Sequence, residues 1–255
     1  MSAPAWQVWV DRGGTFTDVV ARAPDGALHM EKLLSEAPGY ADAAVEAVRR
    51  LLARQGGGRV EAVKMGTTVA TNALLERRGE PTALVITAGH ADALLIGWQS
   101  RPRLFDLDIR KPAPLNAFTI EALERVAADG QMLQPLDEAR LAADLAATHA
   151  AGARAAAIVF LHAHRFPEHE RRAAAIARAA GFAQVSASHE VAPLIKLVSR
   201  GDTTVVDAYL SPILRRYVDR VAAELGGSEG CRLMFMASSG GLTDAALFQG
   251  RDAIL

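Results

Sequence analysis

The chain has 255 residues, of which 50% are hydrophobic and 22% are charged, so its composition is that of a globular protein with ample apolar surface to bury. Its 28 lysines and arginines nearly balance 29 aspartates and glutamates, and a formal net charge of -1 gives no overall field to attract a nucleic acid. Cys231 is the single cysteine, which excludes an internal disulfide and a metal site built from several cysteines. No signal peptide or long apolar run is present, so we predict a cytoplasmic protein that does not enter a membrane.

The first part of the chain has the pattern of three short strands followed by a helix. Tight turns at Gly13-Gly14 and at Pro24-Asp25-Gly26 separate apolar segments at 8–11, 18–21 and 28–34. Apolar residues then recur at helical spacing from Tyr40 to Leu52. The pattern predicts an antiparallel meander that leads into an amphipathic helix.

The middle of the chain alternates strand and helix patterns. Strands at 60–65 and 82–87 flank a helix at 68–77, which predicts a βαβ unit. Prolines interrupt the pattern between residues 97 and 134, where we expect a loop-rich insertion with one hairpin strand at 118–126.

Regular patterns return at Asp137, a good N-cap for a helix through His149. The remaining elements are strands at 156–161, 183–187 and 232–237 and helices at 167–181 and 202–225. Strands that alternate with helices predict an α/β protein with a parallel sheet, and the opening meander makes that sheet mixed. This order suggests the ribonuclease-H-like core of the sugar-kinase and actin-like ATPase superfamily.

The segment from Asp11 to Asp18 is the sharpest local signal of chemistry. An acid at a strand end precedes two glycines, whose backbone amides can approach a ligand closely, and then the hydroxyls of Thr15 and Thr17. These groups suit phosphate oxygens and Mg²⁺. An ordinary hairpin with glycines at its turn explains the same residues equally well on this evidence alone.

Further strand-to-helix junctions carry weaker signals. At 65–72 a helix begins just after a strand, so its free amides and dipole could hold an anion, although Thr67 or Thr68 can simply cap the helix. At 199–204 a glycine and hydroxyls precede a long helix, and capping by Asp202 is at least as good an explanation as catalysis. His162, His164 and His169 lie close together, but we expect structural or surface roles because no metal-ligand spacing surrounds them.

Together these segments resemble the 5-oxoprolinase and hydantoinase A family. Its hallmarks are an Asp-x-Gly-Gly-Thr-x-Thr-Asp start, found here at 11–18, and a Gly-Thr-Thr-x-Ala-Thr-Asn-Ala segment, found here at 66–73. Longer stretches are similar to the 5-oxoprolinases rather than to the hydantoin-cleaving members, namely 32–36, 70–80, 160–170 and 188–217. The resemblance covers nearly the whole chain and favours a phosphate loop at Asp11 over an ordinary hairpin.

The resemblance implies an ATP-dependent hydrolase of cyclic amides. In the family, ATP phosphorylates the carbonyl oxygen of a five-membered ring so that water can attack the ring carbon, and the expected reaction converts 5-oxo-L-proline to L-glutamate with ADP and phosphate. The implied cofactors are ATP and Mg²⁺, with a monovalent cation as a further candidate. Asp11 would be the catalytic and metal-directed residue. The residues expected to bind the cofactor are Asp11, Arg12, Gly13, Gly14, Thr15, Thr17, Thr67, Thr68, Asn72 and Asp202.

The resemblance also implies how the chain is organised. We expect an N-terminal family domain at 1–200 and the beginning of a hydantoinase A domain at 201–255, with a second phosphate turn and an adenine-binding subdomain missing after Leu255. On that basis the chain is an incomplete fragment that is inactive alone. Its expected partners are a hydantoinase B-like half, fused or separate, and a further copy of itself in a homo-oligomer. The alternatives are a hydantoin-cleaving or ketone-carboxylating enzyme, or a non-catalytic module.

Overall fold

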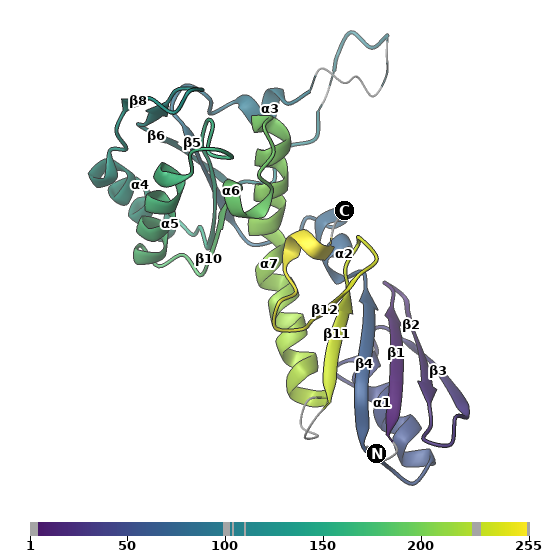
Figure 1. Cartoon of the computed structure of the whole chain (residues 1–255). Helices are drawn as coiled ribbons and strands as arrows, with labels where there is room; N and C mark the ends of the chain where they lie inside the picture. The colour runs from purple at the N-terminus through teal and green to yellow at the C-terminus, as the bar shows by residue number, and fades with distance from the viewer. Residues whose placement is uncertain (1–4, 99–102, 104, 110, 226–230, 254–255) are drawn as a thin grey trace. The chain divides into compact units, whose positions relative to one another are not determined.

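A computed structural model of the chain describes residues 5–98, 103, 105–109, 111–225 and 231–253 (Figure 1). These residues form two compact units, one from Met1–Arg78 together with Ile213–Leu255 and the other from Gly79–Pro212. The helix α7 (Leu197–Leu225) contributes its first part to one unit and its second part to the other. The boundary predicted at residue 200 concerns family domains, which is a different division, and it stays a prediction.

The first unit is built on a six-stranded mixed sheet in the order β12-β11-β4-β1-β2-β3. The opening meander is confirmed, because β1 pairs antiparallel with β2 and β2 pairs antiparallel with β3. On its other side β1 pairs parallel with β4, and β4 pairs parallel with β11. The strands are β1 (Trp6–Arg12), β2 (Phe16–Arg22), β3 (Leu28–Leu34), β4 (Val60–Thr67), β11 (Arg232–Met236) and β12 (Leu242–Asp244).

The core of the first unit lies between one face of this sheet and two helices, α1 (Ala43–Arg54) and the second part of α7. Asp42 begins α1, since its Oδ1 accepts hydrogen bonds from the backbone N of Ala44 (2.9 Å) and of Val45 (3.2 Å). Such a cap satisfies two of the free amides at a helix start. The unit also contains the short helix α2 (Val69–Leu75) and the 3-10 helix η1 (Gly250–Ala253).

The second unit is built on a four-stranded parallel sheet in the order β10-β9-β5-β6. Apolar clusters cover both of its faces, which explains why every residue of β5 and β9 is buried. The strands are β5 (Thr82–Thr87), β6 (Phe118–Ala122), β9 (Ala155–Val159) and β10 (Gln184–Ala187), with a hairpin of β7 (Arg125–Val126) and β8 (Met132–Gln134). The helices are α3 (Ala93–Ile96), α4 (Glu138–Ala150), α5 (Glu168–Ala179) and α6 (Ser188–Val191).

Three sequence-based expectations were wrong. The strands β4 and β5 do not form a βαβ unit, because they belong to different sheets and the chain leaves the first unit after Arg78. The segment 118–126, expected as one hairpin strand, contains two strands: β6, which pairs parallel with β5 at a sheet edge, and β7, which does form a hairpin with β8. Asp202 is not an N-cap, because α7 begins earlier, at Leu197. The expected cap at Asp137 is confirmed by its bond from the Arg140 backbone N (3.1 Å).

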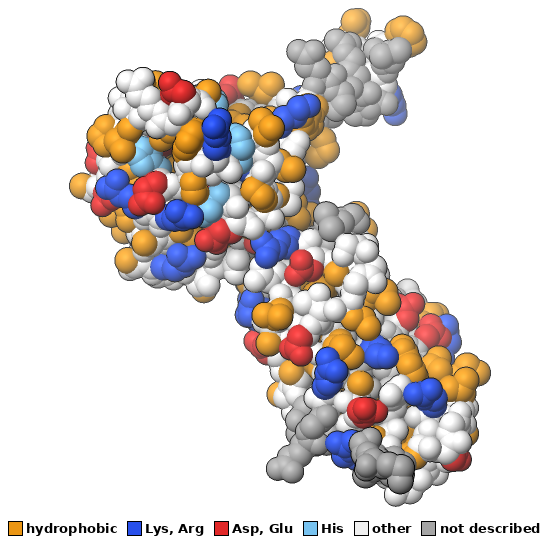
Figure 2. Space-filling model, viewed as in Figure 1, with side chains coloured by type: hydrophobic (Ala, Val, Ile, Leu, Met, Phe, Trp, Pro, Cys, Tyr) orange, Lys and Arg blue, Asp and Glu red, His pale blue; other side chains and the backbone are white. Residues whose placement is uncertain are grey.

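Surface composition is mixed on both units. Figure 2 shows basic, acidic and hydrophobic side chains interspersed on the visible face of each. Within the residues that the structure describes, no helix is long and apolar enough to cross a membrane.

Candidate functional site

The two motifs of the sequence meet at one edge of the six-stranded sheet. Because β1 and β4 are parallel neighbours, Asp11 pairs with Gly66 and Arg12 pairs with Thr67. The start of α2 is fixed to the same edge, since the backbone N of Thr68 donates to the Arg12 carbonyl (3.1 Å). The carboxyl ends of two parallel strands and a helix start therefore converge, as in many ligand sites of α/β proteins.

Ser35, which directly follows β3, fixes the glycine turn after β1 by hydrogen bonds. Ser35 donates its backbone N to the Thr15 carbonyl (2.8 Å) and its Oγ to the Gly13 carbonyl (2.7 Å). The hydroxyl of Thr17 is buried and lies 3.0 Å from the Ser35 hydroxyl. Thr17 was expected to face phosphates, but in this structure its hydroxyl is turned inward, where it supports the turn. Nothing in the sequence singles out Ser35 within the stretch 32–36, and its role is shown only by these hydrogen bonds.

Gly14 allows a close approach between the turn and α2. A side-chain Cβ on Gly14 would lie 3.1 Å from Asn72 Nδ2, which is tighter than most Cβ contacts. Asn72 is itself positioned by donating to Thr68 Oγ1 (3.3 Å). The predicted residues Gly14, Thr68 and Asn72 are thus brought together.

An open cleft of about 760 Å³ adjoins this turn within the first unit. Its walls come from the turn, α2 and the second part of α7, and its lining residues are Arg12, Gly14, Thr15, Glu36, Val69, Asn72, Ala73, Glu76, Arg78, Ile213, Arg216, Tyr217 and Arg220. Asp11 and Arg12 point to opposite faces of the sheet because they are successive residues of one strand. Arg12 therefore faces the cleft, whereas Asp11 faces the other side, where its Oδ1 would lie 3.5 Å from a Cβ on Gly66.

One side of the cleft holds a cluster of charged and aromatic groups, of which only Arg12 was expected at the site from the sequence. Asp42 Oδ2 lies 3.6 Å from Arg12 Nε and 3.9 Å from Arg220 Nη2. Both guanidinium groups also lie over the Tyr217 ring, at 5.0 Å and 5.6 Å from its centre. Burial, and then the charge of Asp42, raise the pKa of the Tyr217 phenol well above its usual value. Tyr217 is therefore a neutral hydrogen-bonding group at physiological pH.

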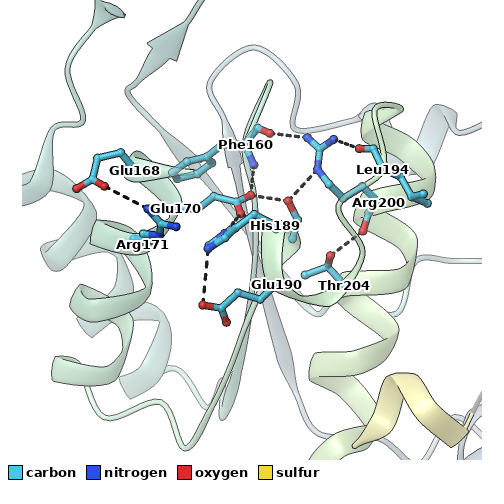
Figure 3. Close-up of polar contacts among 10 residues, drawn as sticks. Phe160, Glu168, Glu170, Arg171, His189, Glu190, Leu194, Arg200 and Thr204 are labelled. Atoms are coloured by element: carbon cyan, nitrogen blue, oxygen red, sulfur yellow. Dashed lines mark hydrogen bonds and ion pairs between the residues drawn. The ribbon is translucent and has the colours of Figure 1, made fainter. Parts of the chain in front are cut away.

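Asp202 belongs to the other unit, and its expected contact with the cofactor stays a prediction. It lies inside α7, and partial burial raises the pKa of its carboxyl. Its neighbour Arg200 is the residue of this segment with the most extensive contacts. Arg200 is completely buried and donates to Ser188 Oγ (2.8 Å) and to the carbonyls of Leu194 (2.5 Å) and Phe160 (2.6 Å) (Figure 3).

A buried carboxylate completes this network. Glu170 accepts hydrogen bonds from the Phe160 backbone N (2.8 Å), from Ser188 Oγ (2.6 Å) and from His189 Nδ1 (2.7 Å) (Figure 3). The opposite charges of Glu170 and Arg200 are thus joined through shared partners at the ends of β9 and β10. These contacts give Arg200 a structural role in packing α7 against these strands.

Two family models match the chain. The model described as "Hydantoinase/oxoprolinase N-terminal region" matches residues 7–181, and the model described as "Hydantoinase/oxoprolinase" matches residues 200–255. Among curated proteins, the chain is 37% identical to the 5-oxoprolinase of Saccharomyces cerevisiae, over 98% of this chain and 23% of that protein.

Two solved structures have the same fold as this chain. The ATP-dependent caprolactamase of Pseudomonas jessenii superimposes with a TM-score of 0.84 and 31% identity, over 97% of this chain and 38% of that one. A nucleotide-free acetone carboxylase superimposes with a TM-score of 0.80 and 22% identity, over the same shares, and supports the fold alone. The mixed α/β fold is therefore confirmed and is consistent with the actin-like ATPase superfamily. The chain spans less than half the length of each of these relatives.

Proposed function

Because this chain belongs to the hydantoinase/oxoprolinase family, we propose that it forms part of an enzyme that opens a cyclic amide with ATP. The proposed reaction converts 5-oxo-L-proline to L-glutamate with release of ADP and phosphate. Its main support is the convergence of the glycine turn, the strand ends and the α2 start beside one cleft. The identity to a 5-oxoprolinase over nearly the whole chain supports the choice of substrate.

In this proposal the glycine turn holds the phosphates of ATP. The exposed backbone of Gly14 and Thr15 supplies neutral donors, which bind phosphate oxygens well in such a glycine turn. Asp11, at the end of β1, is an exposed carboxylate suited to Mg²⁺ or its water shell. Phosphorylation of the ring oxygen makes the ring carbon electrophilic and gives water a target that an unstrained amide does not offer.

The enzyme we propose is larger than this chain. The related caprolactamase sequence is named a subunit alpha, so that protein works with another subunit. We propose a hydantoinase B-like half, fused or separate, as the partner of this chain, self-association of the complex, and a cytoplasmic location. A monovalent cation is proposed as a further cofactor.

A substrate panel tests the proposal. The complete enzyme is assayed with ATP and Mg²⁺ against 5-oxo-L-proline, hydantoin, caprolactam, and acetone with bicarbonate, and ADP and organic products are both measured. We expect the highest kcat/KM with 5-oxo-L-proline and glutamate as the product. A preference for hydantoin or caprolactam would keep the reaction type but replace the substrate, whereas acetone carboxylation would overturn the proposed hydrolysis.

A further inference from the structure

We propose that Arg12, Tyr217 and Arg220 form a subsite in the cleft that binds the carboxylate of the substrate. This inference rests on the proposed function and deepens it, because it says how the enzyme distinguishes a carboxylated ring from a plain lactam. The three side chains come from β1 and α7 and line the cleft that the glycine turn adjoins.

The charges of this cluster are not balanced. Asp42 uses its Oδ1 to cap α1, so only its Oδ2 faces the two guanidinium groups. Neither contact is a hydrogen bond, because the distances are 3.6 Å to Arg12 and 3.9 Å to Arg220. Two cations thus share one oxygen of one carboxylate, and the group retains a net positive charge that an anionic ligand would neutralise.

Three buried polar atoms of the cluster also have no hydrogen-bond partner among the described residues. They are one acceptor, Asp42 Oδ2, and two donors, Arg12 Nε and the hydroxyl of Tyr217, a residue that is only 4% exposed. The Thr67 side chain lies close enough to lower the pKa of Tyr217, although not in hydrogen-bonding geometry. Unpaired buried donors are costly in a folded protein, so their presence together at a cleft indicates a site for an acceptor. A carboxylate has enough acceptor positions for both arginines and the phenol.

The position of the cluster favours a substrate carboxylate over a nucleotide phosphate. Asp11, the metal-directed acid, lies on the opposite face of β1 from the cluster, so Mg²⁺ would bind on the far side of the glycine turn. Gly14 and Thr15 line the cleft together with the arginines. A ring that places its carbonyl at the glycine turn would therefore present its carboxylate to Arg12 and Arg220. The cleft volume of about 760 Å³ is ample for a five-membered ring.

The test compares two rings that differ only in the carboxylate, 5-oxo-L-proline and 2-pyrrolidinone. In the complete enzyme, Arg220→Gln is expected to raise KM for 5-oxo-L-proline roughly 10- to 100-fold, the range for a hydrogen bond to a charged group. Tyr217→Phe keeps the ring under the arginines and is expected to raise KM by roughly tenfold. For both variants KM for ATP and turnover of 2-pyrrolidinone should stay unchanged. Arg215→Gln is the matched control, an exposed arginine of the same helix that does not line the cleft.

The outcomes separate this inference from the function on which it rests. An increase in KM for ATP in Arg220→Gln, or no change for either substrate, would overturn the subsite while leaving ring opening intact. A wild-type enzyme that does not open 5-oxo-L-proline would overturn the proposed function instead. In that case calorimetric binding of 5-oxo-L-proline decides the subsite: binding that is lost in Arg220→Gln but kept in Arg215→Gln supports it, and binding that is absent or equal in both overturns it.

Discussion

The buried arginine at the start of α7 offers a sharp test of what holds the Gly79–Pro212 unit together. Arg200→Ala removes a charged side chain that donates to Ser188 Oγ and to the carbonyls of Leu194 and Phe160, at 2.5 to 2.8 Å. It also removes the positive charge of Arg200, which interacts electrostatically with the buried carboxylate of Glu170. We expect the free energy of unfolding to fall by about 4 kcal/mol, within the range of roughly 3–5 kcal/mol for breaking a buried charge pair.

The magnitude follows from counting the contacts that are lost. The three shortest of the four hydrogen bonds that Arg200 donates, at about 1.5–3 kcal/mol each, give a gross loss of roughly 4.5–9 kcal/mol, and relaxation around the deleted side chain lowers this figure. Arg200→Lys keeps the charge but cannot reproduce the planar fork that reaches three directions, so we expect most of the loss to persist. Arg215→Ala, at an exposed position of the same helix, should cost less than about 0.5 kcal/mol.

The stability of the second unit has to be measured locally, because the chain contains two units and two units can unfold in separate steps. Hydrogen exchange of β9 amides, and of the Phe160 amide bound to Glu170, reports the stability of the second unit directly. Faster exchange in Arg200→Ala and Arg200→Lys, with unchanged exchange in β1, is the expected pattern. A loss below about 1 kcal/mol in Arg200→Ala would refute the view that this network holds the start of α7.

Three further predictions concern other parts of the chain. Gly79→Ala should lower unfolding free energy by about 1–3 kcal/mol, because its Cβ would lie 2.0 Å from the Tyr209 ring, whereas Gly39→Ala meets no atom within 4 Å and is the control in the same denaturation series. Burial, and then the charge of Arg200, lower the pKa of His164 below 6.5. The contribution of neutral His164 to the free energy of unfolding should therefore be fully present above that pH and should decrease as the pH falls below it. In a pH series of unfolding curves, His164→Asn should reduce this decrease. The purified chain by itself should be folded but should release no glutamate from 5-oxo-L-proline with ATP, because phosphoryl transfer requires groups on both sides of a nucleotide. Stoichiometric glutamate release by the chain alone would contradict this prediction.

The local parts of the fold could be predicted from the sequence because they depend on neighbouring residues. The meander from Trp6 to Leu34 follows from two short turns, and the cap at Asp137 follows from one side chain and the next helical turn. The division into two sheets could not be predicted in this way. Strand patterns show that β4 and β5 exist, but pairing depends on contacts between distant segments, which periodicity does not encode.

The candidate site likewise has one part that could be predicted from the sequence and one part that could not. The glycine turn and the start of α2 carry composition signals, so Gly14 and Asn72 could be proposed before the structure was known. The cluster of Asp42, Tyr217 and Arg220 could not, because the whole Gly79–Pro212 unit separates Asp42 from Tyr217 and Arg220 in the sequence, and these residues meet only in the folded protein. Within α7 the spacing of Tyr217 and Arg220 marks one helix face and nothing more.

The central claim is that this chain contributes a phosphate-binding strand end to an ATP-coupled, ring-opening enzyme. The most direct measurement is the release of glutamate, ADP and phosphate from 5-oxo-L-proline by the complete enzyme, compared between wild type and Asp11→Asn. We predict equal amounts of the three products from the wild type and none above background from the variant, because the substitution removes a metal-directed charge from an exposed strand terminus. The circular dichroism spectra of the two proteins should be the same, which shows that the fold is unchanged. Wild-type turnover in Asp11→Asn would contradict the account and leave Asp11 as a turn residue.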